Sequence, residues 1–220
     1  MSDTPHPPLV ESCEELFLEH GDNYLGQGWT KSQANTDRRR DVMLDLMKGR
    51  TGPVTLLDFG CGTGQLLEYM RALHIDDVEY TGLDVSDLFI RVAREKFPDV
   101  QFHLGDLLAG ELELPMFDYI VMNGLFTYRG PVAFDEMSAH WQRLVTAAMT
   151  HARIGVAFNV TSPYVDWERD DLFHVPMQLL ADFVAASPCP YFRLRHDYEL
   201  FETTVHAFRE PTPARRTEPS

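Results

Sequence analysis

The stretch at residues 56–64, LLDFGCGTG, decides the fold. It continues an apolar run that begins at Val54, reaches the carboxylate of Asp58, and then meets three alternating glycines. A near-continuous apolar run is typical of a parallel strand that is buried on both faces of a sheet. Glycines directly after such a strand let the backbone turn sharply and let a ligand approach main-chain N–H groups. The stretch therefore predicts a buried strand, a ligand-binding turn and the start of a helix.

Strands and helices alternate on both sides of this stretch. Further strands are expected at residues 78–84, 100–104, 117–123 and 154–160, and helices at residues 11–20, 32–48, 63–73, 87–97, 134–151 and 176–186. This alternation predicts a parallel sheet with right-handed crossovers. Residues 191–208 contain two extended runs whose connection is too short for a helical crossover, so the last strand should be antiparallel to its neighbour.

Length and composition limit the class of protein. The chain has 220 residues, 44% of them hydrophobic, which favours one domain over residues 1–220 with a large core. We expect a loose tail at residues 1–8, an N-terminal helical lid at residues 10–50, a cofactor-binding core at residues 51–209 and a loose tail at residues 210–220.

Charge and cysteine content limit the partners. A net charge of −15 argues against broad binding to nucleic acid or to an anionic membrane surface. The three cysteines are widely spaced, and the chain shows neither a basic leader nor a long apolar run. We therefore expect a cytoplasmic protein that acts as a monomer or homodimer, with no nucleic-acid and no membrane partner.

The spacing of the glycines discriminates between classes of nucleotide site. The third glycine is Gly64, one residue earlier than a dinucleotide-binding G-x-G-x-x-G requires, because Gln65 occupies that position. No Lys-Ser or Lys-Thr pair ends the turn, which excludes a nucleotide P-loop. An ordinary strand-to-helix turn is the structural alternative.

Carboxylates follow three successive predicted strands, at Asp58, Asp84 and Asp106. Asp84 could accept hydrogen bonds from both hydroxyls of a ribose, and Asp106 could accept one from the amine of an adenine. Taken singly, each could equally be a solvated loop residue or a helix cap. Together the three favour a cofactor that contains adenosine.

With these residues the chain resembles the class I S-adenosylmethionine-dependent methyltransferases. The resemblance rests on LLDFGCGTG, GLDVS, GDLL and FDYIVMNG, and covers residues 54–208. It implies an α/β fold, a Rossmann-like three-layer sandwich with a seven-stranded, mostly parallel sheet and an antiparallel last strand. It also implies S-adenosyl-L-methionine as cofactor and S-adenosyl-L-homocysteine as product. The implied cofactor-binding residues are Asp58, Gly60, Cys61, Gly62 and Gly64 for the methionine part, Asp84 and Val85 for the ribose, Asp106 and Leu107 for the adenine, and Asn123 and Gly124 beside the sulfonium.

Similar enzymes also fold their N-terminal segment over the cofactor. The candidate lid here is GQGWTKSQ at residues 26–33. Trp29, or Tyr24 just before the lid, would shield the sulfonium, and Gln33 would reach a polar group. The alternative for Trp29 is packing of the N-terminal helices on the sheet.

Catalytic groups are expected where the fourth and fifth strands end, and the candidates are Tyr128, Asp166 and His174. His174 is the first candidate for a general base, because imidazole titrates near neutral pH. It could instead be a histidine at a helix N-terminus with no catalytic part. Asp166 could bind a substrate amine or be a solvated loop charge. The histidines and cysteines show no spacing typical of metal ligands, so no metal site is expected.

The chain is therefore expected to methylate oxygen or nitrogen of a small-molecule substrate, with a sugar or a secondary metabolite as candidates. Asn123 is followed by Gly-Leu-Phe, which lacks the two prolines of the Asn-Pro-Pro-aromatic sequence used by DNA base methyltransferases. Two alternatives stay open: a protein or peptide methyltransferase, and a catalytically silent module that binds S-adenosylmethionine.

Overall fold

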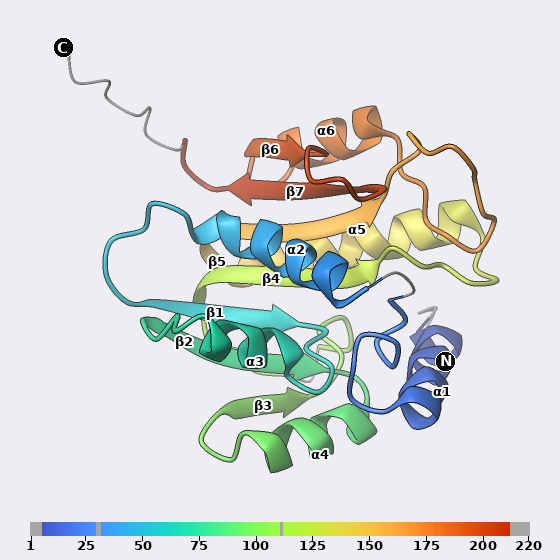
Figure 1. Ribbon diagram of the computed structural model, residues 1–220. Helices are drawn as coiled ribbons and strands as arrows, with labels where there is room; N and C mark the ends of the chain where they lie inside the picture. Colours follow the sequence, from blue (N-terminus) through green and yellow to red (C-terminus); the bar gives the residue numbers. More distant parts are fainter. Residues whose placement is uncertain (1–5, 30–31, 111, 212–220) are drawn as a thin grey trace.

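The computed structural model describes residues 6–29, 32–110 and 112–211, and shows one seven-stranded sheet with helices on both faces (Figure 1). The strand order is β3-β2-β1-β4-β5-β7-β6. The strands are β1 (Val54–Phe59), β2 (Val78–Asp84), β3 (Gln101–Leu104), β4 (Phe117–Phe126), β5 (Ala152–Thr161), β6 (Tyr191–Arg195) and β7 (Glu202–Phe208). The helices are α1 (His6–His20), α2 (Gln33–Leu44), a 3₁₀ turn (Asp45–Met47), α3 (Gln65–Ala72), α4 (Asp87–Lys96), α5 (Phe134–His151) and α6 (Met177–Ala185).

The pairing of the strands confirms the predicted fold class. β1 is parallel to both β2 and β4, and the parallel set continues to β3 on one side and β5 on the other. β7 is antiparallel to both of its neighbours, β5 and β6. Only residues 196–201 join β6 to β7, which suits an antiparallel hairpin and leaves no room for a crossover helix.

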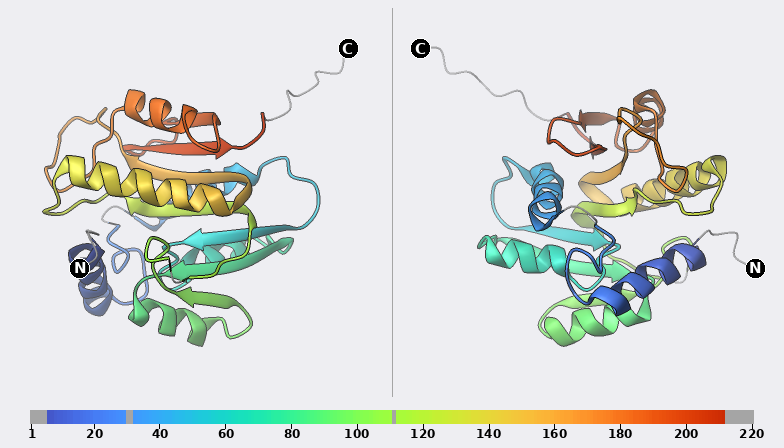
Figure 2. Two further views of the ribbon diagram at one scale, coloured as in Figure 1. Left: turned by 180° about the vertical axis from the view of Figure 1, so that it is seen from behind. Right: turned by 45° about the vertical axis from the view of Figure 1, so that its right-hand side comes forward.

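Two apolar clusters fill the space between the sheet and its helices. Met43 of α2, Leu66 of α3 and Ile90 of α4 pack on one face, and Trp141 of α5 and Leu180 of α6 pack on the other. Seen from behind, α5 lies in front of the sheet (Figure 2). α1 stands apart from both layers, beyond the ends toward which the parallel strands run (Figure 1).

The bounds of α1 and β4 differ from the predictions. α1 begins at His6, whereas a loose tail was expected to residue 8, because Pro7 and Pro8 fall in the first turn, where a helix tolerates proline. β4 continues to Phe126, with an irregular register between Met122 and Phe126. The predicted C-terminal tail lies outside the described residues from residue 212 onward. Among the described helices, none combines the length and apolar composition that a membrane crossing requires.

Candidate active site

The glycine turn joins β1 to α3 at the edge of the sheet where the parallel strands end. Gly62 has a φ of +53°, and a Cβ at this residue would meet nothing within 4 Å. The turn thus combines a left-handed backbone, which glycine adopts without strain, with open space beside it. Gly64 also has a positive φ and caps the N-terminus of α3.

Asp84 ends β2 and holds the same turn in place. One carboxylate oxygen accepts a hydrogen bond from the Gly62 N–H at 2.9 Å, and the other accepts one from the Ser86 N–H, also at 2.9 Å. Burial raises the pKa of Asp84, and the backbone N–H groups act against that rise. The Val85 N–H also lowers the pKa of Asp84 through a hydrogen bond. A carboxylate has about four lone-pair sites, so the side chain can still accept from a ligand.

Asp58 lies deeper, at the end of β1. Its carboxylate accepts a hydrogen bond from the Tyr80 hydroxyl at 2.6 Å. Burial raises the pKa of Asp58 to about 7. Asp58 can therefore change its charge near neutral pH.

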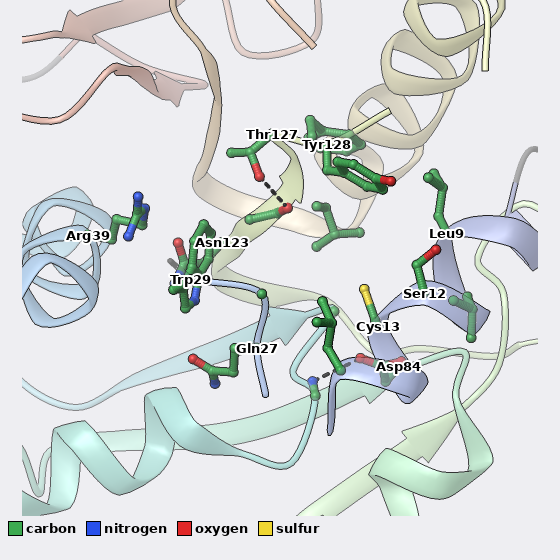
Figure 3. A pocket seen from close by; sticks show the side chains of 18 of the residues that line it. Leu9, Ser12, Cys13, Gln27, Trp29, Arg39, Asp84, Asn123, Thr127 and Tyr128 are labelled. Atoms are coloured by element: carbon green, nitrogen blue, oxygen red, sulfur yellow. Dashed lines mark hydrogen bonds between the residues drawn. The ribbon is translucent and has the colours of Figure 1, made fainter. Parts of the chain in front are cut away.

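A cavity of about 720 Å³ opens above these residues (Figure 3). Leu9, Ser12 and Cys13 of α1 lie beside Tyr128 on one side of it, and Trp29 and Asn123 lie on the other. The predicted site residues that line the cavity are Asp58, Gly60, Cys61, Gly62, Asp84, Val85, Asp106, Asn123, Gly124, Trp29 and Tyr128.

Trp29 and four other residues form a closed ring of contacts. The Gly124 N–H donates to Asn159 Oδ1 at 2.7 Å, and Asn159 Nδ2 donates to Glu202 Oε2 at 2.8 Å. Arg39 Nε donates to Glu202 Oε1 at 2.6 Å, and the Arg39 guanidinium lies 3.9 Å from the centroid of a Trp29 ring. The ring closes where Trp29 packs on Gly124, whose absent Cβ would lie 2.7 Å from the indole. The lid is therefore tied to α2, β4, β5 and β7.

Asn123 adds a buried polar atom to the cavity wall. Its Oδ1 is buried and has no hydrogen-bond partner among the described residues. Because a buried acceptor without a donor is costly, a ligand that donates a hydrogen bond there would be favoured.

Five predicted site residues are not placed on the cavity wall. Gln33 is exposed and donates to Asp37 at 2.7 Å, within the first turns of α2. A Cβ at Gly64 would lie against Phe97 and Phe102, and Leu107 packs against the apolar cluster that contains Trp141. Thr30 and Lys31 of the predicted lid fall outside the described residues.

Asp166 and His174 are the other two, and both belong to the segment between β5 and α6. Asp166 is exposed to solvent. The His174 ring is held within this segment, with Nδ1 2.8 Å from the Ser162 carbonyl oxygen and Nε2 3.4 Å from the Arg169 backbone nitrogen. Both ring nitrogens of His174 thus contact the local backbone, and the role of His174 as a general base stays a prediction.

The sequence interpretation missed Cys13, His140 and Glu202, which line the cavity. Gln27 of the predicted lid, Arg39 and Trp167 also line it. Glu202 gave no local signal, because it reaches the site only through its antiparallel pairing with Thr161.

Comparison with known proteins agrees with this geometry. A family described as a methyltransferase domain matches residues 57–153. The protein Rv1506c of Mycobacterium tuberculosis (strain ATCC 25618 / H37Rv), which is named as a methyltransferase, is 31% identical over 155 residues, covering 70% of this chain and 92% of the relative. The chain belongs to the class I S-adenosylmethionine-dependent methyltransferases.

Two further proteins are similar to this methyltransferase, one over a smaller part of the sequence and one in fold alone. A dTDP-3-amino-3,4,6-trideoxy-alpha-D-glucopyranose N,N-dimethyltransferase of Streptomyces venezuelae is 34% identical over 85 residues, covering 38% of this methyltransferase and 32% of the relative. The magnesium protoporphyrin IX methyltransferase of Synechocystis PCC 6803, solved with bound S-adenosylmethionine, has a TM-score of 0.62 at 14% identity, over 96% of this methyltransferase and 98% of that chain. The second similarity shows the shared fold.

S-adenosylmethionine is the cofactor of this methyltransferase, and the cavity suits it. Gly62 leaves open space beside the turn, Asp84 can accept a further hydrogen bond, and Asn123 Oδ1 has no donor among the described residues. These features lie just after β1, at the end of β2 and on β4, and the three strands are adjacent in the sheet.

Proposed function

We propose that this methyltransferase transfers the methyl group of S-adenosylmethionine to oxygen or nitrogen of a small molecule, with a sugar or a secondary metabolite as candidates. The observation that carries the proposal is the covered cavity. α1 and the segment at residues 26–29 both line it, so an acceptor must fit beneath them. A volume of about 720 Å³ lies in the range of small-molecule sites, roughly 300–1,000 Å³.

The cofactor-binding roles follow from the position of each residue on the cavity wall. The backbone at Gly60–Gly62 would hold the methionine part, Asp84 would accept from the ribose hydroxyls, and Asp106 would take the adenine. Asn123 Oδ1 would accept a hydrogen bond beside the methyl group. Trp29 would exclude water from the same place, since its indole covers Gly124.

Methyl transfer requires that the acceptor atom is aligned with the methyl–sulfur bond and that one proton is removed from the acceptor. When bound, S-adenosylmethionine supplies an activated methyl: the methyl–sulfur bond breaks, a methyl–oxygen or methyl–nitrogen bond forms, and the electron pair of the broken bond stays on sulfur. The Tyr128 hydroxyl could orient the acceptor. His140 of α5, which is buried at the cavity wall, is the candidate to receive the proton from an oxygen or ammonium acceptor.

Two of the similar proteins act, by their names, on small acceptors. By its name, the Streptomyces venezuelae enzyme acts on an amino sugar, and the Synechocystis enzyme on a porphyrin. Both are compact molecules. A peptide would require an open groove, whereas α1 and residues 26–29 both contribute to the wall of this cavity.

Calorimetric titration tests the proposal. S-adenosylhomocysteine and S-adenosylmethionine should bind in the micromolar range, and NAD should not. A screen of methyl transfer from labelled cofactor should then find its acceptor among small alcohols and amines. Transfer to basic peptides, with no transfer to any small molecule, would overturn the proposal in favour of a protein methyltransferase.

A further inference from the structure

The sheet order divides the cavity into two halves. Asp58, Asp84 and Asp106 follow β1, β2 and β3, so the adenosyl part of the cofactor occupies that half. The other half lies over β4, β5 and β7. Its described lining includes Tyr128, Trp167, Arg169, Asp171, Leu172, Phe201 and Glu202. The acceptor must enter this second half.

The cations on the described cavity wall are three arginines, and each is already paired with a carboxylate. Arg39 pairs with Glu202, and both side chains are largely buried. Arg169 uses two of its nitrogens to bind the two oxygens of Asp171, with Nε at 2.9 Å. The third arginine, Arg40, pairs with Asp37 at 3.0 Å.

This pairing works against anionic acceptors. A phosphate or carboxylate that entered would meet guanidinium charges that are already neutralised, and would compete with a bound carboxylate for the N–H donors. The displaced carboxylate at Glu202 would then stay buried without its partner, which is unfavourable.

Exposed carboxylates lie on the cavity wall and in a segment that contributes to it. Glu15 and Glu19 of α1 line the cavity and are exposed. The segment between β5 and α6, of which Trp167 and Arg169 line the cavity, carries exposed carboxylates at Asp166, Glu168 and Asp170, which do not line it. A cleft lined mainly by one sign of charge attracts ligands of the opposite sign, and the whole chain carries −15.

An exposed aromatic ring also lines the cavity. The Trp167 side chain is 45% exposed, lines the cavity, and meets the edge of Phe201 with 6.0 Å between ring centroids. An indole held in this way can stack against a flat ring and can attract a cation to its face.

We infer that the acceptor of this methyltransferase is an uncharged or cationic ring-bearing molecule that stacks on Trp167, and that anionic acceptors are rejected. The inference rests on the proposed small-molecule function. It separates this enzyme from the Streptomyces venezuelae relative, because a dTDP-linked sugar carries a diphosphate.

Matched probes test the inference on the protein loaded with S-adenosylhomocysteine. Tryptamine and indole-3-acetate share one ring and differ in charge, and their binding can be compared by calorimetry at 20 and 200 mM salt. Tryptamine should bind about tenfold more tightly than indole-3-acetate, with the difference shrinking at high salt. Trp167→Ala should weaken tryptamine binding about fivefold or more. Tyr164→Ala, an exposed aromatic of the same segment that does not line the cavity, should leave it unchanged.

A gain-of-binding variant provides the second arm. Asp171→Asn releases Arg169 from its carboxylate while keeping the size of the side chain, so indole-3-acetate should bind this variant about tenfold more tightly than the wild type. Equal binding of the two probes to the wild type, or binding of neither, would overturn the inference. Failure to load S-adenosylhomocysteine would instead contradict the cofactor assignment.

Discussion

The substitution Asp58→Asn should change how the stability of the methyltransferase depends on pH. Burial raises the pKa of Asp58 from an ordinary 3.8 to about 7 in the folded protein. In the unfolded chain the carboxyl is solvated and returns to the ordinary value. The folded state therefore holds this proton more tightly, and the stability is lost as pH rises from 3.8 through 7.

The magnitude follows from these two pKa values. At pH 5 the burial of Asp58 costs the folded state about 2 kcal/mol, and at pH 8 it costs about 4 kcal/mol. The free energy of unfolding should thus fall by about 2 to 3 kcal/mol between pH 5 and pH 8 on account of this one group. Asparagine carries no charge at either pH and can still accept the hydrogen bond from Tyr80.

Urea unfolding of the cofactor-free protein at pH 5 and pH 8 measures the effect. Other groups also titrate, so the quantity to compare is the pH dependence of the wild type minus that of the variant. Asp99→Asn is the matched control, because the Asp99 side chain is 67% exposed and pairs with Arg71 at the surface. If Asp58→Asn and the wild type lose the same stability between the two pH values, Asp58 is ionised in the folded state throughout and the argument from burial is refuted.

Three more outcomes are expected. Asp84→Ala should weaken binding of S-adenosylhomocysteine by about 2 to 4 kcal/mol in calorimetry, because two ribose hydrogen bonds are lost; an unchanged dissociation constant would remove the ribose assignment. Gly124→Ala should lower the free energy of unfolding by about 2 kcal/mol more than Gly49→Ala does. Both glycines have φ near +87°, but only Gly124 lies under Trp29, so equal losses would mean that the indole moves aside. Glu202→Gln should shift the tryptophan emission and raise the KM for S-adenosylmethionine several-fold, because Arg39 loses its carboxylate beside Trp29. An emission spectrum identical to that of the wild type would contradict the ring of contacts.

Much of the cofactor half of the site could be predicted from the sequence, for a geometric reason. Parallel strands end at one edge of a sheet, so Asp58, Asp84 and Asp106 converge whenever the strands before them are identified correctly. The antiparallel end of the sheet followed in the same way from the short connection between residues 191–195 and 202–208.

The acceptor half could not be predicted as well, because it depends on contacts between distant residues. His174 follows a strand and has the right chemistry, yet its ring turns toward the Ser162 carbonyl oxygen. Glu202 opens the last strand, 163 residues after its partner Arg39. Nothing in the neighbourhood of either residue in the sequence encodes such a contact.

The position of β7 has a consequence for how the chain assembles during translation. β7 is the last strand to leave the ribosome, but it is inserted between β5 and β6 instead of being added at an edge. Until it arrives, β5 offers an open strand edge to other nascent chains, and β6 has no partner in the sheet. β7 also carries Glu202, so the ion pair between Arg39 and Glu202 can form only after β7 has been inserted into the sheet. The sheet and the Arg39–Glu202 contact that holds the lid are therefore completed in the same step of folding.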